Sequence, residues 1–212
     1  MKRIATCLCV LAAISGANAQ SEGEPGDFDF YILALSWSPT WCATSEGAAR
    51  SRQCDAESER GFVVHGLWPQ YEEGYPEFCR SGSRPSRSEV ASILDIMPDR
   101  GLAAHAWRKH GSCSGLDPQD YFDATRTAFE RVRIPQEFVT PAVEGSISAQ
   151  AVEAAFVAAN SGLESSGVAV SCGDGWLEEV RICLTHEFDF RDCEEVDARG
   201  CRQNRLRLPA PR

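Results

Sequence analysis

The segment at residues 61–69 reads Gly-Phe-Val-Val-His-Gly-Leu-Trp-Pro, and it constrains the fold more than any other stretch. Its apolar, β-branched and aromatic residues predict a short strand, which we expect Pro69 to stop because proline cannot donate to a sheet ladder. His65 interrupts the apolar run beside Gly66 and Trp68. By itself, such a histidine is most often a core residue that donates to a backbone carbonyl, so a chemical role needs a second signal.

A second segment, residues 105–113, supplies that signal: it reads His-Ala-Trp-Arg-Lys-His-Gly-Ser-Cys, within a helix predicted over 102–110. At 100° per residue, Ala106, Lys109 and His110 lie on one helix face. A lysine beside a histidine is a poor structural pair because like charges repel. The pair suits an anion, however, and histidine is the side chain best placed to move protons near neutral pH.

Two further features of this helix point the same way. His105 lies at the rim of the face formed by Lys109 and His110, so it adds a second histidine to the predicted anion site. Lys109 is also the only lysine after residue 19, where the other 18 basic residues are arginines. A compact point charge is what lysine offers and arginine does not, which favours a specific role for Lys109.

The remaining pattern predicts an α+β fold with a mainly antiparallel central sheet flanked by helices and stabilised by disulfides. Strands are expected at 28–35, 61–68, 168–172 and 176–185, with 187–190 as a further candidate. Helices are expected from Ser88 to Met97, over 102–110, from Asp117 to Phe129, and from Ser148 to about Asn160. Residues 43–60 are expected to form a surface loop, and 71–87 and 191–212 to be irregular and tied by disulfides.

The first 19 of the 212 residues resemble a secretory signal peptide. Lys2 and Arg3 precede an apolar run of eleven residues, and Ala17-Asn18-Ala19 forms a small-x-small cleavage signal. The run is too short to span a membrane, which takes about 20 apolar residues. We therefore expect residues 20–212 to form a single exported domain, periplasmic or secreted, with no membrane partner, and a monomer.

Charge and cysteine content narrow the class of protein further. The net charge of −10 becomes −12 once Lys2 and Arg3 are removed, which argues against an indiscriminate nucleic-acid or membrane binder. Eight cysteines remain, an even number that indicates four disulfides in an exported chain. Zinc is the weaker alternative, since the sequence has neither a CxxC pair nor the HExxH motif. A GxSxG nucleophile motif is also absent.

The two histidine segments resemble those of the T-two ribonucleases, the acid, base-nonspecific endoribonucleases. Residues 62–69 match the first active-site segment of that family, and residues 105–113 match the second, HEWxKHG[TS]C. Residues 30–42 are similar to its opening strand, and residues 177–183 to its late LxEVxIC strand. The resemblance extends over about 28–201, nearly the whole predicted domain.

The resemblance implies a reaction and a set of roles. Single-stranded RNA would be cleaved by transphosphorylation to 2′,3′-cyclic phosphate ends, with low base specificity and neither metal nor cofactor. His110 would be the general base and His65 the general acid. Lys109 would neutralise charge on the phosphoryl oxygens, and His105 would bind phosphate. Trp68 would stack on a base, and Gln70 would lie in the same substrate-binding region.

The resemblance, together with the order of the cysteines, also implies how the disulfides pair. The expected pairs are Cys42–Cys54, Cys79–Cys113, Cys172–Cys201 and Cys183–Cys193.

Ala106 departs from the family pattern, which has a glutamate at that position. Its loss removes no obligatory proton carrier but takes away a carboxylate near the reacting groups. Stabilisation would then fall to Lys109, His105 and a carboxylate from elsewhere, such as Asp99 or Glu77. The departure leaves an alternative open, a catalytically weakened RNA-binding or scaffold protein on the same fold.

Overall fold

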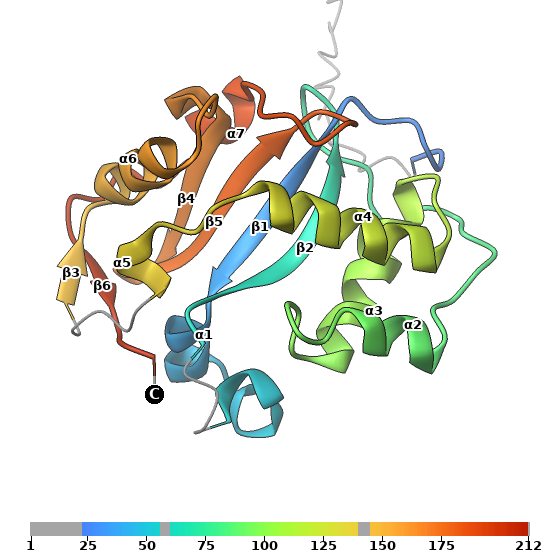
Figure 1. The fold of residues 1–212 in the computed structure, drawn as a ribbon, viewed down its shortest axis with the longest axis horizontal. Helices are drawn as coiled ribbons and strands as arrows, with labels where there is room; N and C mark the ends of the chain where they lie inside the picture. The colour runs from blue at the N-terminus through green and yellow to red at the C-terminus, as the bar shows by residue number, and fades with distance from the viewer. Residues whose placement is uncertain (1–22, 56–59, 140–144, 212) are drawn as a thin grey trace, which may run out of the picture.

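A computed structural model describes residues 23–55, 60–139 and 145–211, so the predicted signal peptide lies outside the described residues. A six-stranded sheet forms the centre, in the order β2-β1-β5-β6-β3, with β4 also paired to β5 (Figure 1). The strands are β1 (Phe30–Trp37), β2 (Phe62–Gln70), β3 (Gly145–Ile147), β4 (Val168–Gly173), β5 (Trp176–Leu184) and β6 (Leu206–Leu208). All described pairings are antiparallel except that of β5 with β6, which confirms the predicted α+β class.

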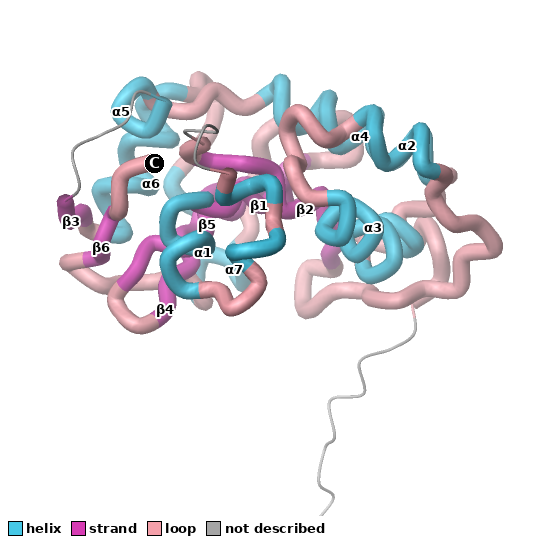
Figure 2. The backbone as a smooth tube through the Cα atoms, turned by 90° about the horizontal axis from the view of Figure 1, so that it is seen from below, coloured by secondary structure: helices cyan, strands magenta, loops and turns pink. Residues whose placement is uncertain are grey.

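Helices cover the sheet unequally. The α-helices are α1 (Ser38–Thr44), α2 (Arg87–Ser92), α3 (Arg100–Lys109), α4 (Pro118–Arg131), α5 (Gln136–Val139), α6 (Ala149–Ala159) and α7 (Glu194–Ala198). Figure 2 shows α4, α5 and α6 together along one side of the sheet. Their apolar faces pack on the side chains of β1 and β5 that point that way, and this layer is the main core. The other face has only a small apolar cluster, which leaves room for a site there.

A β-bulge interrupts the pairing of β2 at its histidine. Ala34 of β1 pairs with Gly66, but the next residue, Leu35, pairs with Val64, so His65 is an extra residue in the ladder. A bulge changes the direction in which the side chains on either side of it point. Val64 and Leu67 can therefore both face the main core, while His65 leaves that face.

Several predicted boundaries of strands and helices differ from those in the structure. Pro69 does not stop β2, which continues to Gln70; β2 lies at the end of the strand order, where a sheet tolerates proline. The helix predicted from Ser88 starts one residue earlier, at Arg87, because its N-cap is Ser86, which forms a reciprocal capping box with Glu89. It also ends at Ser92, before a turn in which the Met97 N–H donates to Ile93 O at 2.9 Å.

The C-terminal part was also predicted incompletely. Residues 187–190 form a turn rather than a strand, with Phe188 at φ 65° and a single bridge between Leu184 and Phe190. Residues 191–212 are not uniformly irregular, since they contain α7 and β6. Both elements are too short to give a recognisable sequence pattern, and tertiary contacts hold them in place.

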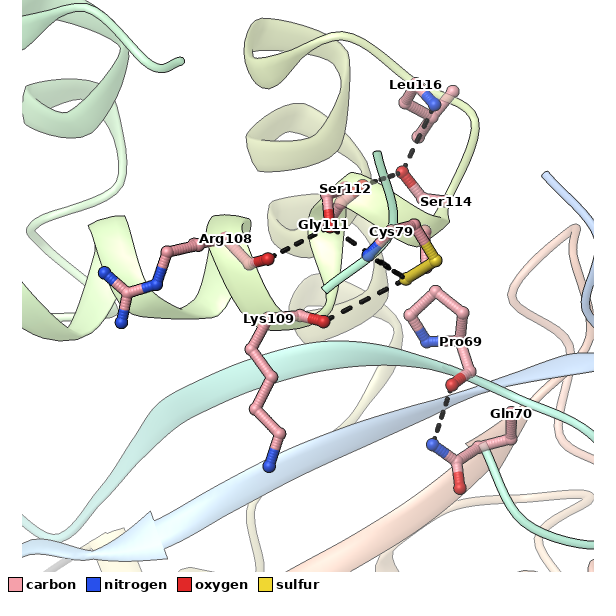
Figure 3. The surroundings of a disulfide bond; sticks show 10 residues. Pro69, Gln70, Cys79, Arg108, Lys109, Gly111, Ser112, Ser114 and Leu116 are labelled. Atoms are coloured by element: carbon pink, nitrogen blue, oxygen red, sulfur yellow. Dashed lines mark hydrogen bonds between the residues drawn. A yellow bond between two sulfur atoms is a disulfide. The ribbon is translucent and has the colours of Figure 1, made fainter. Parts of the chain in front are cut away.

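Four disulfides join the described cysteines: Cys42–Cys54, Cys79–Cys113, Cys172–Cys201 and Cys183–Cys193. These are the pairs that the resemblance implied. The second of them links the loop after β2 to the turn that follows α3, and Figure 3 shows this bond beside Lys109. Two segments that carry the candidate histidines are thus joined covalently.

Candidate active site

A cavity of about 340 Å³ lies on the sheet face that α4 and α6 leave uncovered. Strands β1, β2 and β5 form its floor, and α3, α7 and the loop after β2 form its walls. The side chains that matter for chemistry are His65, Trp68, Gln70, Tyr75, His105, Lys109, His110, Arg181 and Arg199. The structure thus brings together all six expected residues, which are five from the two histidine segments and Gln70 directly after the first segment.

His65 reaches this cavity from the bulge in β2 and contacts Glu179 of β5 through Nδ1. The Glu179 carboxylate also accepts a hydrogen bond from Arg181, at 3.0 Å from the guanidinium. Burial raises the pKa of the Glu179 carboxyl, but the hydrogen bond to His65 and the positive charges of His65 and Arg181 outweigh it. The pKa therefore lies below its ordinary value, and Glu179 is an anion beside His65.

His110 lies in the opposite environment. It is the C-cap of α3, only 7% exposed, and its ring stacks on Trp68 with centroids 4.9 Å apart. Burial, and then the charges of Lys109, His65 and His105, lower the pKa of His110 to about 2. No carboxylate among the described residues contacts it, and its buried Nδ1 has no hydrogen-bond partner there. His110 is thus held as a neutral imidazole, the form that can accept a proton.

The turn after α3 fixes the position of His110 relative to β2. Gly111 is required here, since a Cβ atom would come within 2.6 Å of the Trp107 ring and 2.9 Å of the Tyr121 ring. Tyr121 of α4 in turn donates a hydrogen bond to Leu67 O at 2.9 Å. This contact connects the turn, through a fully buried ring, to the strand that carries His65.

Lys109 and His105 complete the cationic wall of the cavity. Figure 3 shows the Lys109 side chain reaching down from α3 toward the strands, while Arg108 points away. The Lys109 ammonium lies 3.4 Å from the Glu77 carboxylate and 5.7 Å from the centre of the Tyr75 ring. His105 Nδ1 accepts from the Arg108 guanidinium at 2.9 Å, which leaves its Nε2–H free to donate even when the ring is neutral. Burial, then Arg108 and Lys109, lower the pKa of His105.

Trp68 and Gln70 occupy different positions in the site. Trp68 lies between the two histidines, 5.3 Å from the His65 ring and 4.9 Å from the His110 ring, with the Arg181 guanidinium 5.5 Å from its own ring centre. Gln70 is buried, and its amide donates to the adjacent Pro69 O at 2.8 Å, as Figure 3 shows. Its side chain in this conformation is turned toward its own backbone.

Sequence reasoning missed Glu179 and Arg181 as site residues. Both lie at alternate positions of the late strand segment, where Arg181 lines the cavity and Glu179 contacts His65, so the period-two pattern of β5 was the available signal. It also missed the wall formed by α7, where Glu195 accepts from the Gly74 N–H at 2.7 Å and Arg199 lines the cavity.

Neither of the two carboxylates suggested as replacements near Ala106 is among the residues that line this cavity, but Glu77 contacts Lys109, which does line it. Asp99 caps α3 by accepting from the Leu102 N–H at 2.9 Å, and its other oxygen accepts from Ser51 at 2.8 Å, so it has a structural role. Glu77 contacts Lys109, as described above. Ala106 itself lines the cavity one helical turn before His110.

The described residues contain neither a membrane-spanning helix nor a cluster of metal ligands. Within 23–55, 60–139 and 145–211, there is no helix whose length and apolar character would let it cross a membrane. The same ranges contain no group of three or more histidine, cysteine, aspartate or glutamate side chains that could hold a metal ion.

Comparison with known proteins supports the resemblance seen in the sequence. The model of the Ribonuclease T2 family matches residues 28–193. A ribonuclease of Aeromonas hydrophila is 43% identical over 122 residues, which cover 57% of this chain and 54% of that protein. The chain matches only about half the length of this relative and of a probable ribonuclease of Haemophilus influenzae. Ribonuclease DdI of Dictyostelium discoideum is 26% identical over 95% of this chain and 96% of its own.

Solved structures show the same fold. RNase NT, solved in complex with 5′-AMP, superposes with a TM-score of 0.67 at 24% identity and covers 87% of this chain and 99% of its own. Trichomaglin, described as an S-like ribonuclease, gives a TM-score of 0.69 at 22% identity, over 88% of this chain and all of that one. Since the family model matches most of the chain, and the fold agrees, this protein belongs to the ribonuclease T2 family.

Proposed function

We propose that the protein is an endoribonuclease that cleaves single-stranded RNA by internal transphosphorylation. The observation that carries the proposal is the contrast between two histidines of one cavity. His65 is paired with a carboxylate, whereas His110 is buried without one and has a pKa lowered to about 2. Titratable groups whose environments differ in this way suit acid and base roles in one reaction.

In this mechanism the neutral His110 takes the proton of the ribose 2′-OH, and the 2′ oxygen attacks phosphorus. His65, as the imidazolium, gives its proton to the departing 5′ oxygen, so the products are a 2′,3′-cyclic phosphate and a free 5′-OH. Lys109 and the Nε2–H of His105 stabilise the charge on the non-bridging oxygens. Each proton transfer by a positioned group is worth about 10²–10⁴-fold in rate.

Trp68 supports low base specificity, because every base offers a π-face to an aromatic ring. The walls of the cavity add cations rather than a dense set of polar groups around a base edge. This favours recognition of phosphate over recognition of base identity.

The proposal includes export of the protein to the periplasm or the medium as a single-domain monomer. The N-terminal segment supports this, and so do the four disulfides, which persist in oxidising compartments. Fractionation of cells that express the full chain, followed by mass determination of the mature N-terminus, tests the compartment and the cleavage after Ala19. Light scattering on the purified protein tests the monomer.

The activity is tested with the purified, oxidised protein and single-stranded RNA at pH 4–8 in the presence of EDTA. We expect internal cleavage and oligonucleotides that end in 2′,3′-cyclic phosphate, identified by mass spectrometry. RNA binding without cleavage would instead support the scaffold alternative raised by Ala106. Cleavage that EDTA abolishes, or products that lack cyclic phosphate ends, would contradict the mechanism.

A further inference from the structure

The contact between His65 and Glu179 joins residues from two strands that do not pair with each other. Glu179 lies opposite Ser36 in the ladder of β5 with β1, and β1 separates β5 from β2. The carboxylate crosses above β1, where Ser36 Oγ donates to its Oε1 at 3.4 Å. The bulge at His65 is what turns the imidazole toward it, so the contact depends on the irregular pairing of β2.

The chemistry of this contact fixes the state of the imidazole. An ionised carboxylate only accepts hydrogen bonds, so His65 Nδ1 must carry the proton. Nε2 is then the nitrogen that exchanges a proton with substrate. A negative charge at Nδ1 also stabilises the imidazolium, the form that a general acid needs before it donates.

Glu179 is well held for this task. Its side chain is 11% exposed, and its second oxygen accepts from Arg181 Nε and from the terminal nitrogen of the same guanidinium, at 3.2 and 3.0 Å. The guanidinium fixes the carboxylate plane and keeps it ionised, which leaves Oε1 for His65 and Ser36. A buried carboxylate with both oxygens occupied is preorganised, so it loses little entropy when the reaction begins.

We propose that Glu179 is the positioning residue of His65. It keeps the proton on Nδ1 and turns Nε2 toward the substrate, and it stabilises the positive charge of the general acid. Arg181 anchors the Glu179 carboxylate. The inference rests on the proposed transphosphorylation, since it assigns Glu179 to the acid half of that reaction. It gives the chain a carboxylate in the site although position 106 has none. The Glu179 carboxylate contacts His65, whereas position 106 lies one helical turn before His110.

Other charged groups also face His65 and must be held constant in any test. They are Glu179 and Arg181 on β5, His105 and Lys109 on α3, His110 at its end, and Arg50 and Asp99 across an adjoining cavity. Only Glu179 contacts the His65 ring through a carboxylate among the described residues. Substituting this residue therefore removes the one close anion and leaves the cations in place.

The test compares Glu179→Gln with wild type on two substrates that differ in leaving group. Cleavage of a dinucleotide such as UpA expels a 5′ alkoxide, which needs a proton from the general acid. Uridine 3′-(4-nitrophenyl phosphate) expels a phenolate, which leaves without one. We expect kcat on UpA to fall about 10–100-fold, the scale of losing an outer partner that orients a reacting histidine. On the aryl ester we expect a fall of less than about threefold, with KM little changed on both substrates.

The difference between the two leaving groups is the readout that a purely structural role would not give, because a general loss of structure slows both substrates alike. The matched control is Glu178→Gln, which removes the same charge one residue away on an exposed part of β5. We expect this control to retain wild-type kcat.

The outcomes separate the two proposals. If Glu179→Gln slows both substrates equally, or leaves UpA cleavage at the wild-type rate, Glu179 is not the positioning residue of the acid. His65→Ala, measured in parallel, tests the proposed transphosphorylation on which the role of Glu179 rests. If His65→Ala slows both substrates equally, His65 is not the acid and the proposed mechanism fails. If His65→Ala shows the leaving-group dependence and Glu179→Gln does not, only the role of Glu179 is overturned.

Discussion

The indole of Trp68 lies almost parallel to the imidazole of His110, with an angle of 21° between the planes and 4.9 Å between centroids. This contact removes one face of His110 from solvent, and burial is the largest cause of its lowered pKa. Trp68 therefore affects the candidate base, in addition to the stacking on an RNA base that we propose for it. The two roles can be separated by substitution.

Trp68→Ala is expected to hydrate His110 and raise the pKa of His110 from about 2 toward its ordinary value. A larger fraction of His110 is then protonated between pH 4 and 6, so kcat/KM should fall at acid pH more than at pH 7. The pH profile of kcat/KM and an NMR titration of His110 check this. Trp68→Phe, which keeps a stacking ring, should retain most of the wild-type profile. An acid limb that does not move in Trp68→Ala would contradict the argument.

Loss of either proton-transfer histidine should remove nearly all activity. His65→Ala and His110→Ala are each expected to lower kcat about 10²–10⁴-fold at the optimum pH, measured on a fluorogenic RNA substrate. His186→Ala is the matched control. His186 Nε2 donates to Phe28 O at 3.2 Å and its ring stacks on Phe28, so it supports the fold away from the cavity. Near-wild-type turnover in His110→Ala would refute the assignment.

Ala106→Glu is expected to raise kcat about tenfold or more and to leave KM roughly unchanged. Ala106 is 2% exposed and packs in the main core, but it also lines the cavity one turn before His110, so a glutamate there has to extend into the cavity beside the reacting groups. A well-placed electrostatic group is worth about 10²–10³ in kcat, part of which Lys109 and His105 already supply. Ala106→Gln, of the same size but uncharged, serves as the control. A flat or reduced kcat in Ala106→Glu would show that the site has no use for a carboxylate there.

A stability prediction concerns Glu153 of α6, a buried carboxylate remote from the cavity. Its Oε1 accepts from the Val170 N–H at 3.1 Å. Burial raises the pKa of Glu153, so ionising it costs stability as the pH rises from its ordinary pKa through the raised one. Glu153→Gln keeps an acceptor for Val170 without the charge. We expect it to raise Tm by about 1–2 °C at pH 7 and to have no effect near pH 3, by calorimetry. A stabilisation that is equal at both pH values would exclude ionisation as its cause.

The fold could be predicted from the sequence wherever a local signal was complete. Asp117 and Pro118 marked the start of α4 because a cap and a helix-compatible proline act within one turn, and Ser148 did the same for α6. The strand predicted over 176–185 agrees with β5 (Trp176–Leu184) to within one residue. By contrast, α7 depends on the disulfides that flank it, and β6 depends on its pairing with β3 and with Trp176 of β5, which no local pattern encodes.

The candidate site was predicted in the same uneven way. Five of the six expected residues that line the cavity could be picked out because each histidine segment is contiguous in sequence, and Gln70 directly follows the first segment. Glu179 and Arg181 were missed because their role depends on the neighbouring strands and on a bulge that turns His65 toward β5. Periodicity can place a carboxylate on a sheet face, but the partner it meets there is set by tertiary pairing.

The disulfides Cys183–Cys193 and Cys172–Cys201 flank α7, which forms one wall of the cavity through Glu195, Val196 and Arg199. α7 is a five-residue helix, too short to be stable by itself, so its position depends on these two tethers. A chain whose thiols are still reduced has neither tether, so this wall of the cavity becomes fixed only when both disulfides have formed. The geometry of the cavity therefore depends on thiol oxidation as well as on the packing of the sheet and its helices.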